Sequence, residues 1–163
     1  MILCKIETVS FDETAQMGIV LLVEEHGERA VPIWVGIFET QAIMIKIKET
    51  HFPRPLTHDL LKSCMEKLGG KVEYVLINDI LDNTFYAQIH IVKDDRKDIL
   101  DSRPSDAIAL AVRVNVPIYV NEKVFEFSGV NKENFLKDQK EKLYLSYLES
   151  LEDDDMGKLK HIN

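Results

Sequence analysis

In Asp101-Ser102-Arg103-Pro104-Ser105-Asp106-Ala107-Ile108-Ala109-Leu110-Ala111, a proline precedes a run of alanine and large aliphatic residues. Proline suits the first turn of a helix, because its fixed φ matches the helix and its missing N–H is not needed there. The stretch therefore predicts a short strand over residues 98–101 and a helix over residues 104–114. Two carboxylates, an arginine and two hydroxyls gather at this helix entrance, which indicates a polar site.

A second polar helix entrance lies upstream, in Phe52-Pro53-Arg54-Pro55-Leu56-Thr57-His58-Asp59. The two prolines stiffen the approach, and the hydroxyl of Thr57 is expected to cap a helix over about residues 57–68. Gly69-Gly70 then ends this helix. Two rigid, polar helix entrances in one small chain suggest a functional site.

Elsewhere the chain alternates apolar and polar residues in runs between turn-forming residues, which is typical of β-strands. In the first half, strands are predicted over residues 3–11, 18–23 and 30–34, and a helix over residues 37–49. The β-branched run at residues 43–47 would also suit a strand. From Lys71 the same order returns, with strands over residues 71–81, 84–93 and 98–101 and the helix over residues 104–114.

The two halves align with nearly constant offsets. Lys5-Ile6-Glu7 corresponds to Lys71-Val72-Glu73 with an offset of 66, and Glu39 corresponds to Asp106 with an offset of 67. Internal duplication of a strand-strand-strand-helix unit is one explanation, and two units that share a common pattern are the other. Duplication would make Glu39 and Asp106 equivalent residues in the first turns of two related helices.

These patterns predict an α+β fold whose mixed or antiparallel sheet is built from two strand-strand-strand-helix units. Short strands are also expected over residues 117–120 and 124–127, and Asn131 can cap a C-terminal amphipathic helix. The expected organisation is a domain over residues 1–128, a helix over residues 129–151 that packs on the core or on a partner, and a disordered tail over residues 152–163.

The chain has 163 residues, 45% of them hydrophobic, as in an ordinary soluble domain. No apolar run approaches the roughly 20 residues that span a bilayer, and the N-terminus does not resemble a signal peptide. Cys4 and Cys64 are the only cysteines, so we expect reduced core thiols rather than a disulfide framework. A cytoplasmic protein without a membrane partner is therefore predicted.

The formal net charge of −8 argues against a broad nucleic-acid-binding surface, which usually carries clustered lysine and arginine. A nuclease can still be acidic when its carboxylates hold divalent cations that meet the phosphate. Strand alternation places Trp34, Phe38, Phe85 and Tyr86 in the core rather than on a surface that stacks bases. The absence of P-loop, GxGxxG, HExxH and GxSxG motifs excludes several common enzyme classes.

The carboxylates around Pro104 have two explanations. Asp106 falls in the first turn of its helix, where a negative charge gains about 0.3–1 kcal/mol from unpaired backbone N–H groups. This role does not explain Asp101 or Arg103, so Asp101 and Asp106 are candidate ligands of a divalent cation, and Arg103 of a phosphate. An internal ion pair between Arg103 and either carboxylate is the structural alternative.

His58 is the better catalytic candidate at the second entrance, because histidine exchanges protons near neutral pH. It would act as a general base or a metal ligand, or else as a structural donor. Asp59 lies in the same first turn, where helix capping would also explain it. Arg54, between two prolines, would suit a preset phosphate contact, although Pro-Arg-Pro also makes a stiff loop without any ligand.

The two entrances, together with Val31-Pro32-Ile33-Trp34-Val35-Gly36 and Asp82-Asn83-Thr84-Phe85-Tyr86-Ala87, resemble the signature blocks of the bifunctional nuclease family. The resemblance spans roughly residues 2–125, in the family's order and spacing. It implies a mixed α/β domain and the cleavage of both DNA and RNA. It also implies a homo-oligomer, with a dimer favoured because the sheet edges need cover.

The leading hypothesis, which rests on this resemblance, is a metal-dependent nuclease that hydrolyses phosphodiester bonds of DNA or RNA. Its catalytic residues would be His58, Asp59, Asp101 and Asp106. Mg²⁺ or Mn²⁺ would be held by Asp101, Asp106 and Glu39. The substrate would be contacted by Arg54, Arg103 and Ser105. The alternative is a non-catalytic binding or assembly domain whose polar loops keep the fold rigid.

Overall fold

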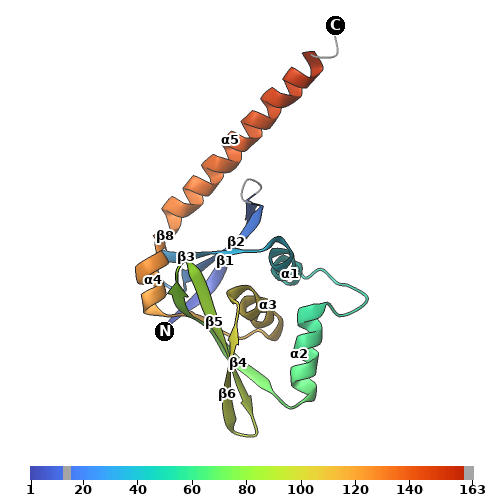
Figure 1. Ribbon diagram of the computed structural model, residues 1–163, viewed down its shortest axis with the longest axis vertical. Helices are drawn as coiled ribbons and strands as arrows, with labels where there is room; N and C mark the ends of the chain where they lie inside the picture. Colours follow the sequence, from blue (N-terminus) through green and yellow to red (C-terminus); the bar gives the residue numbers. More distant parts are fainter. Residues whose placement is uncertain (13–15, 160–163) are drawn as a thin grey trace. The chain divides into compact units, whose positions relative to one another are not determined.

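The structure is a computed structural model that describes residues 1–12 and 16–159 (Figure 1). It forms two compact units, Met1–Val130 and Asn131–Asn163. Within the described residues, the first unit holds the sheet and four helices, and the second holds one long helix, α5 (Lys132–Leu159). Among the described residues, no helix is both long and apolar enough to cross a membrane.

One mixed sheet organises the first unit. Its strands are β1 (Ile2–Asp12), β2 (Met17–Glu24), β3 (Arg29–Val35), β4 (Lys71–Leu81), β5 (Thr84–Lys93), β6 (Arg96–Ser102), β7 (Ile118–Val120) and the short β8 (Val130–Asn131). The helices are α1 (Ile37–Ile47), α2 (Thr57–Lys67), α3 (Pro104–Val114) and α4 (Glu122–Ser128). The strand order is β6-β5-β4-β7-β1-β2-β3-β8, with β7 antiparallel to β1 and parallel to β4. The predicted α+β class with a mixed sheet is therefore confirmed.

The same element order occurs on both sides of β7. When 67 is added to their residue numbers, β3 (29–35) becomes β6 (96–102) and α1 (37–47) becomes α3 (104–114). The predicted strand-strand-strand-helix unit therefore occurs twice. On either side of β7 the strands follow the same outward order, β1-β2-β3 and β4-β5-β6, and β1 and β4 run in opposite directions.

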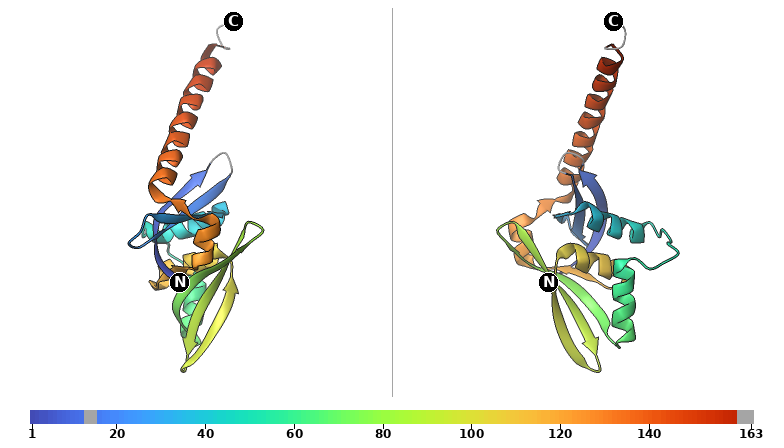
Figure 2. Two further views of the ribbon diagram at one scale, coloured as in Figure 1. Left: turned by 90° about the vertical axis from the view of Figure 1, so that its left-hand side faces the viewer. Right: turned by 45° about the vertical axis from the view of Figure 1, so that its right-hand side comes forward.

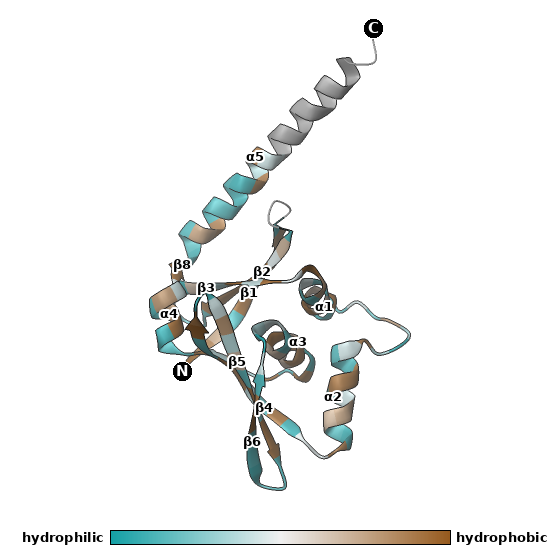
Figure 3. Cartoon of the chain, in the orientation of Figure 1, coloured by the Kyte–Doolittle hydropathy of each residue, from teal (hydrophilic) through white to brown (hydrophobic). Residues whose placement is uncertain are grey.

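The helices α1, α2 and α3 lie together beside the sheet, with α3 packed against both other helices and against β4 and β5 (Figures 1 and 2). Most residues of α3 are buried, because neighbours cover it on several sides. By contrast, β6 is an edge strand of the sheet, and most of its residues are hydrophilic (Figure 3). Because α1 and α2 both pack against α3, this buried helix holds the N-terminal turns of the three helices in place.

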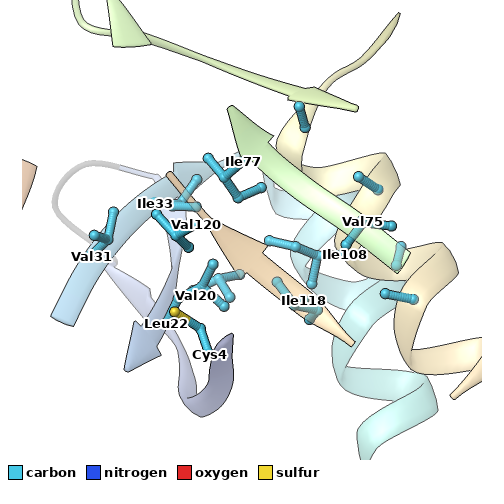
Figure 4. Packing of buried hydrophobic residues seen from close by; sticks show 14 of the residues in the cluster. Cys4, Val20, Leu22, Val31, Ile33, Val75, Ile77, Ile108, Ile118 and Val120 are labelled. Carbon is cyan, nitrogen blue, oxygen red and sulfur yellow. The ribbon is translucent and has the colours of Figure 1, made fainter. Parts of the chain in front are cut away.

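The hydrophobic core joins strands of both halves to α3 (Figure 4). Ile33 of β3, Ile77 of β4 and Ile108 of α3 all belong to it and are at most 1% exposed. Cys4 belongs to the same core, and burial raises the pKa of its thiol to about 12, which keeps the thiol protonated and unreactive. Cys64 is exposed, so the expectation of a core thiol holds for Cys4 alone.

The edge strand predicted over residues 124–127 is instead part of helix α4. Asn121 caps this helix by accepting a hydrogen bond from the backbone N–H of Lys123 at 3.4 Å. The adjacent residues Val124 and Phe125 are both buried, whereas successive residues of a strand point to opposite faces. In α1, residues 43–47 are helical, so the alternative of a strand there is wrong.

The C-terminal helix extends further than predicted. It continues to Leu159, into the tail expected to be disordered over residues 152–163, and residues 160–163 lie outside the described residues. No proline interrupts this run, and its leucine, glutamate and lysine residues favour a helix. Asn131 caps α5 as expected, because its Oδ1 accepts a hydrogen bond from the backbone N–H of Asn134 at 3.1 Å. The packing of this helix on the core or on a partner stays a prediction.

Candidate functional site at the helix entrances

Arg103 joins the entrances of α1 and α3. It is the N-cap residue of α3, and it donates hydrogen bonds from Nε to Asp106 Oδ2 at 2.7 Å and from Nη2 to Asp106 Oδ1 at 3.2 Å. Its Nη1 donates to Glu39 Oε1 at 3.0 Å. Glu39 and Asp106 are each the third residue of their helix. The repeated unit therefore places two equivalent carboxylates on one guanidinium.

His58 approaches the same carboxylate from α2. Its Nε2 lies 3.2 Å from Asp106 Oδ1. The His58 side chain is 13% exposed, whereas that of Arg103 is 66% exposed. Because α2 packs against α3, the two polar stretches of the sequence meet at this point. We name Glu39, His58, Arg103 and Asp106 the entrance cluster.

Hydrogen bonds keep Asp106 ionised. Burial by itself would raise the pKa of its carboxyl group, but the hydrogen bonds from Arg103 and His58 outweigh burial and hold this pKa below its ordinary value. The hydrogen bond to Asp106 in turn raises the pKa of Arg103. An ionised carboxylate only accepts hydrogen bonds, so neutral His58 is assigned the tautomer with its hydrogen on Nε2. Its Nδ1 is then an acceptor.

Asp59, the next residue of α2, instead caps the N-terminus of that helix. Its Oδ2 accepts a hydrogen bond from the backbone N–H of Leu56 at 3.0 Å, and its Oδ1 accepts one from Nε of Arg113 at 2.7 Å. Burial would raise the pKa of Asp59, but these hydrogen bonds outweigh burial and lower it. The predicted cap at Thr57 is wrong, because Leu56 is the N-cap residue and Asp59 reaches back to its N–H.

Arg113 binds three helices together. Its side chain is 2% exposed, and it contacts Asp59 of α2. It also donates from Nη1 to the Ala109 carbonyl of α3 at 2.8 Å and from Nη2 to the Ala42 carbonyl of α1 at 3.0 Å. These bonds hold α2 against α3, on which the contact between His58 and Asp106 depends. Our sequence reasoning missed Arg113, although an arginine in the last turn of an apolar helix was the available signal.

The other predicted residues lie outside the entrance cluster. Asp101 is exposed on β6, opposite Gln88 of β5. Ser105 is buried in the first turn of α3, at 6% exposure. Arg54 is exposed on the loop between α1 and α2. The structure thus brings together four of the predicted residues and leaves Asp59, Asp101, Ser105 and Arg54 apart from them.

The entrance cluster as it stands does not fit a divalent cation. The guanidinium of Arg103 bridges Glu39 and Asp106, where an ion shared by the two carboxylates would have to lie. Within residues 1–12 and 16–159, no three His, Cys, Asp or Glu side chains form a group that could hold a metal ion. Binding of Mg²⁺ or Mn²⁺ here would require Arg103 to move and a substrate phosphate to supply further oxygen ligands.

Three aromatic residues predicted for the core lie at the surface instead. Trp34, Phe38 and Tyr86 are exposed, whereas Phe85 packs against the core. In β3, the neighbours of Trp34 on both sides point into the core, so strand alternation turns Trp34 outward. Phe38 directly precedes Glu39, which puts an exposed aromatic ring next to the entrance cluster in sequence.

Comparison with known proteins agrees with the family expected from the sequence blocks. The sequence model described as "Bifunctional nuclease domain" matches residues 20–133. An uncharacterized protein of Mycobacterium tuberculosis (strain ATCC 25618 / H37Rv) is 38% identical over 122 residues, which are 75% of this chain and 73% of that protein.

Two plant proteins named bifunctional nuclease 2 are also similar. That of Oryza sativa subsp. japonica is 33% identical over 73% of this chain and 38% of its own length. That of Arabidopsis thaliana is 30% identical over 69% of this chain and 35% of its own length. The chain thus spans little more than a third of these plant proteins. By its sequence match over most of its length, the chain belongs to the bifunctional nuclease domain family.

Proposed function

We propose that this protein hydrolyses phosphodiester bonds of DNA or RNA at the entrance cluster. The observation that carries the proposal is the contact of 3.2 Å between His58 Nε2 and the ionised carboxylate of Asp106, with an exposed arginine bound to the same carboxylate. The names of the plant relatives support a nuclease. The histidine, carboxylate and arginine are the groups that such a hydrolysis needs.

In the proposed reaction, His58 is the general base. Asp106 accepts the Nε2 hydrogen and fixes the imidazole ring, so that Nδ1 can take a proton from water. The resulting hydroxide attacks phosphorus, and the bond between phosphorus and the leaving sugar oxygen breaks. The leaving oxygen then takes up a proton from the protonated base or from water. Asp106 is a positioning residue in this scheme, and His58 is the catalytic residue.

Arg103 supplies the positive charge for the phosphate. A guanidinium has five N–H donors, of which Nε, one at Nη1 and one at Nη2 bind Asp106 and Glu39. Two donors are left for the non-bridging oxygens of a phosphate, where negative charge grows during the reaction. Glu39 holds the guanidinium in position from the opposite side.

A non-catalytic binding or assembly domain is the second candidate. It is favoured by the internal pairing of the entrance cluster, since each charge of Arg103, Glu39 and Asp106 already has a partner within the fold. The formal net charge of −8 also favours it. In that case the entrance cluster only keeps α1, α2 and α3 in place.

Cleavage of labelled single-stranded DNA and RNA by highly purified protein tests the proposal. We expect His58→Ala to lower the cleavage rate by about 10²–10⁴-fold, as removal of a general base does. His26→Ala is the matched control, because the His26 side chain is 91% exposed. Equal rates for His58→Ala and the wild type would rule out His58 as the base. Strand binding without turnover, unchanged by EDTA, would favour the second candidate.

A requirement for Mg²⁺ or Mn²⁺ and a cytoplasmic location belong to the same proposal. Loss of cleavage in EDTA, with recovery on adding back Mg²⁺ or Mn²⁺, would support the metal requirement.

A further inference from the structure

We propose that a pocket under the loop between α1 and α2 binds a phosphate group, and that in the substrate this is a backbone phosphate away from the bond that is cut. The pocket has a volume of about 370 Å³. Its lining includes Lys46, His51, Arg54, Asp59 and Arg113. We name it the loop pocket. That its phosphate belongs to a nucleic acid rests on the proposed function, whereas phosphate binding itself does not.

Arg54 is the first observation behind the proposal. The chain has five arginines, and all of them lie within the described residues. Four form ion pairs with carboxylates, namely Arg29, Arg96, Arg103 and Arg113. Within the described part of the chain, Arg54 forms none. In a protein with a net charge of −8, an arginine that lines a pocket without a carboxylate partner is available for an external anion.

The surroundings of Arg54 add positive charge without cancelling it. Lys46 lines the same pocket and lies in the last turn of α1, where the helix dipole alone would explain it. Arg54 lies on the loop and not in a helix, so the helix dipole does not explain its position there. His51 offers a further ring nitrogen. Pro53 and Pro55 restrict the backbone on both sides of Arg54, so less conformational entropy is lost when the arginine is fixed on a ligand.

The acidic side chains of the pocket leave a net positive charge. Asp59 is paired with Arg113 at 2.7 Å, and the Arg113 side chain is 2% exposed, so these two form a neutral floor. The charged residues that remain in the lining are Glu49, which is negative, and Lys46 and Arg54, which are positive. The resulting charge of about +1 complements a phosphate, which a guanidinium can bind through two parallel hydrogen bonds.

The loop pocket and the entrance cluster share the first turn of α2. His58 faces Asp106 in the entrance cluster, whereas Asp59 faces Arg113 in the floor of the loop pocket. A ligand that reaches both sites must carry more than one phosphate, as a polynucleotide strand does. Phe52 lines the loop pocket and is 50% exposed, so its ring can stack against a base of that strand.

The first test measures binding of a 5′-fluorescein-labelled single-stranded 12-mer by fluorescence anisotropy over a series of salt concentrations. The His58→Ala protein is used, so that the strand is not cut. We expect Arg54→Gln to weaken binding about 5- to 20-fold and to reduce the slope of log K against log [salt] by about 0.7, the value for one phosphate contact. Arg54→Lys should retain part of the affinity. Arg96→Gln is the control, because it removes an equal charge from an arginine already paired with Asp98.

The second test uses inorganic phosphate alone and follows the side-chain resonances of His51 by NMR. We expect phosphate to shift these resonances in the wild type and to need an at least fivefold higher concentration in Arg54→Gln. Unchanged resonances, together with equal strand affinity and salt slope in Arg54→Gln and Arg96→Gln, would overturn the loop pocket. Phosphate binding without any effect of Arg54→Gln on the strand would overturn its role in substrate binding. Neither result depends on cleavage, so the nuclease proposal stands or falls separately.

Discussion

Arg103 and Arg113 stand at opposite ends of α3 and have opposite environments. The Arg103 side chain is 66% exposed and shares its donors between two carboxylates that border solvent. The Arg113 side chain is 2% exposed and binds Asp59 and two backbone carbonyls. An exposed ion pair contributes little to stability, whereas removal of one partner from a buried pair leaves a charge without compensation. The two arginines therefore differ in setting: Arg113 is buried and joins helices, whereas the Arg103 side chain is open to solvent, as the proposed phosphate contact requires.

We expect Arg113→Met to destabilise the protein by about 1–3 kcal/mol, because Asp59 and the carbonyls of Ala42 and Ala109 would each lose a hydrogen-bond donor, while water partly solvates the Asp59 carboxylate. Urea unfolding measures this difference. Arg96→Met is the control, since the exposed pair with Asp98 should contribute less than about 1 kcal/mol. Similar unfolding midpoints for the two variants would contradict the role of Arg113 in joining three helices.

The lowered pKa of Asp106 predicts a pH-dependent contribution to stability. Its folded-state pKa lies below its unfolded value, so the stabilisation is present above the unfolded pKa of about 3.9 and is lost as pH falls through the folded pKa. At pH 7, Asp106→Asn should therefore cost about 1.5–3 kcal/mol, the range for hydrogen bonds to a charged group. Urea unfolding of both proteins from pH 7 to pH 2 should show this difference shrinking below about pH 4. A constant difference over the whole range would contradict the assignment.

At the scale of elements, α1 and α3 have the same length and equivalent positions but different packing. α3 is covered on several sides, whereas α1 buries only Thr40 and Ile43. Thr40 lies against Gly18 of β2, and a Cβ on Gly18 would come within 2.7 Å of the Thr40 Cβ. The hydroxyl of Thr40 also donates to the Gly36 carbonyl at 2.8 Å. The close approach of α1 to β2 therefore depends on a glycine, and Glu39 is positioned by this contact.

Gly18→Ala should destabilise the protein by about 1–3 kcal/mol, the usual effect of overpacking, because the Thr40 side chain cannot move away without leaving its hydrogen bond. Thermal and urea unfolding measure the loss. Gly70→Ala is the matched control, since its added Cβ would meet neighbouring atoms at 3.4 and 3.5 Å, which is ordinary contact. If Gly18→Ala unfolds like Gly70→Ala, α1 is not held against β2 in this way.

At the scale of the whole molecule, the sheet has an edge that the described fold leaves open. β6 pairs with β5 and is the terminal strand of the sheet order, and all but one of its residues are exposed. Its apolar residues Ile99 and Leu100 are both exposed. Because these neighbours point to opposite faces, both faces of the edge strand carry exposed apolar surface. Exposed apolar side chains on an open sheet edge offer a surface that another chain can cover.

We predict a homodimer that pairs through β6. Light scattering at micromolar concentration should give about twice the chain mass of 18.8 kDa. The double substitution Ile99→Lys and Leu100→Lys should give a monomer, since charged residues on an edge strand oppose pairing. Lys97→Glu serves as the control, because it changes the charge of the same strand without removing apolar surface. A wild-type monomer would overturn the prediction.

Much of the architecture follows from local patterns in the sequence. Alternation located β1 to β6 to within a few residues, and the proline at the start of residues 104–114 located α3. The offset of 67 between Glu39 and Asp106 also holds between α1 and α3 in the structure. Helix α4 was missed, because residues 124–127 are too short for alternation to distinguish a strand from a helical turn. Aromatic side chains that were predicted to be buried are exposed where the residue lies on the outward face of a strand or in the first turn of a helix.

The sequence by itself determined which side chains stand at the entrances of α1, α2 and α3, because capping and proline preferences act within one turn of a helix. Only the tertiary structure decided which of them meet. Adjacent residues of a helix point about 100° apart, so the packing of α2 on α3 turned His58 toward Asp106 and Asp59 toward Arg113. Neither contact is local, since each joins residues about 50 positions apart in the chain, and only the packed core brings such residues within hydrogen-bonding distance.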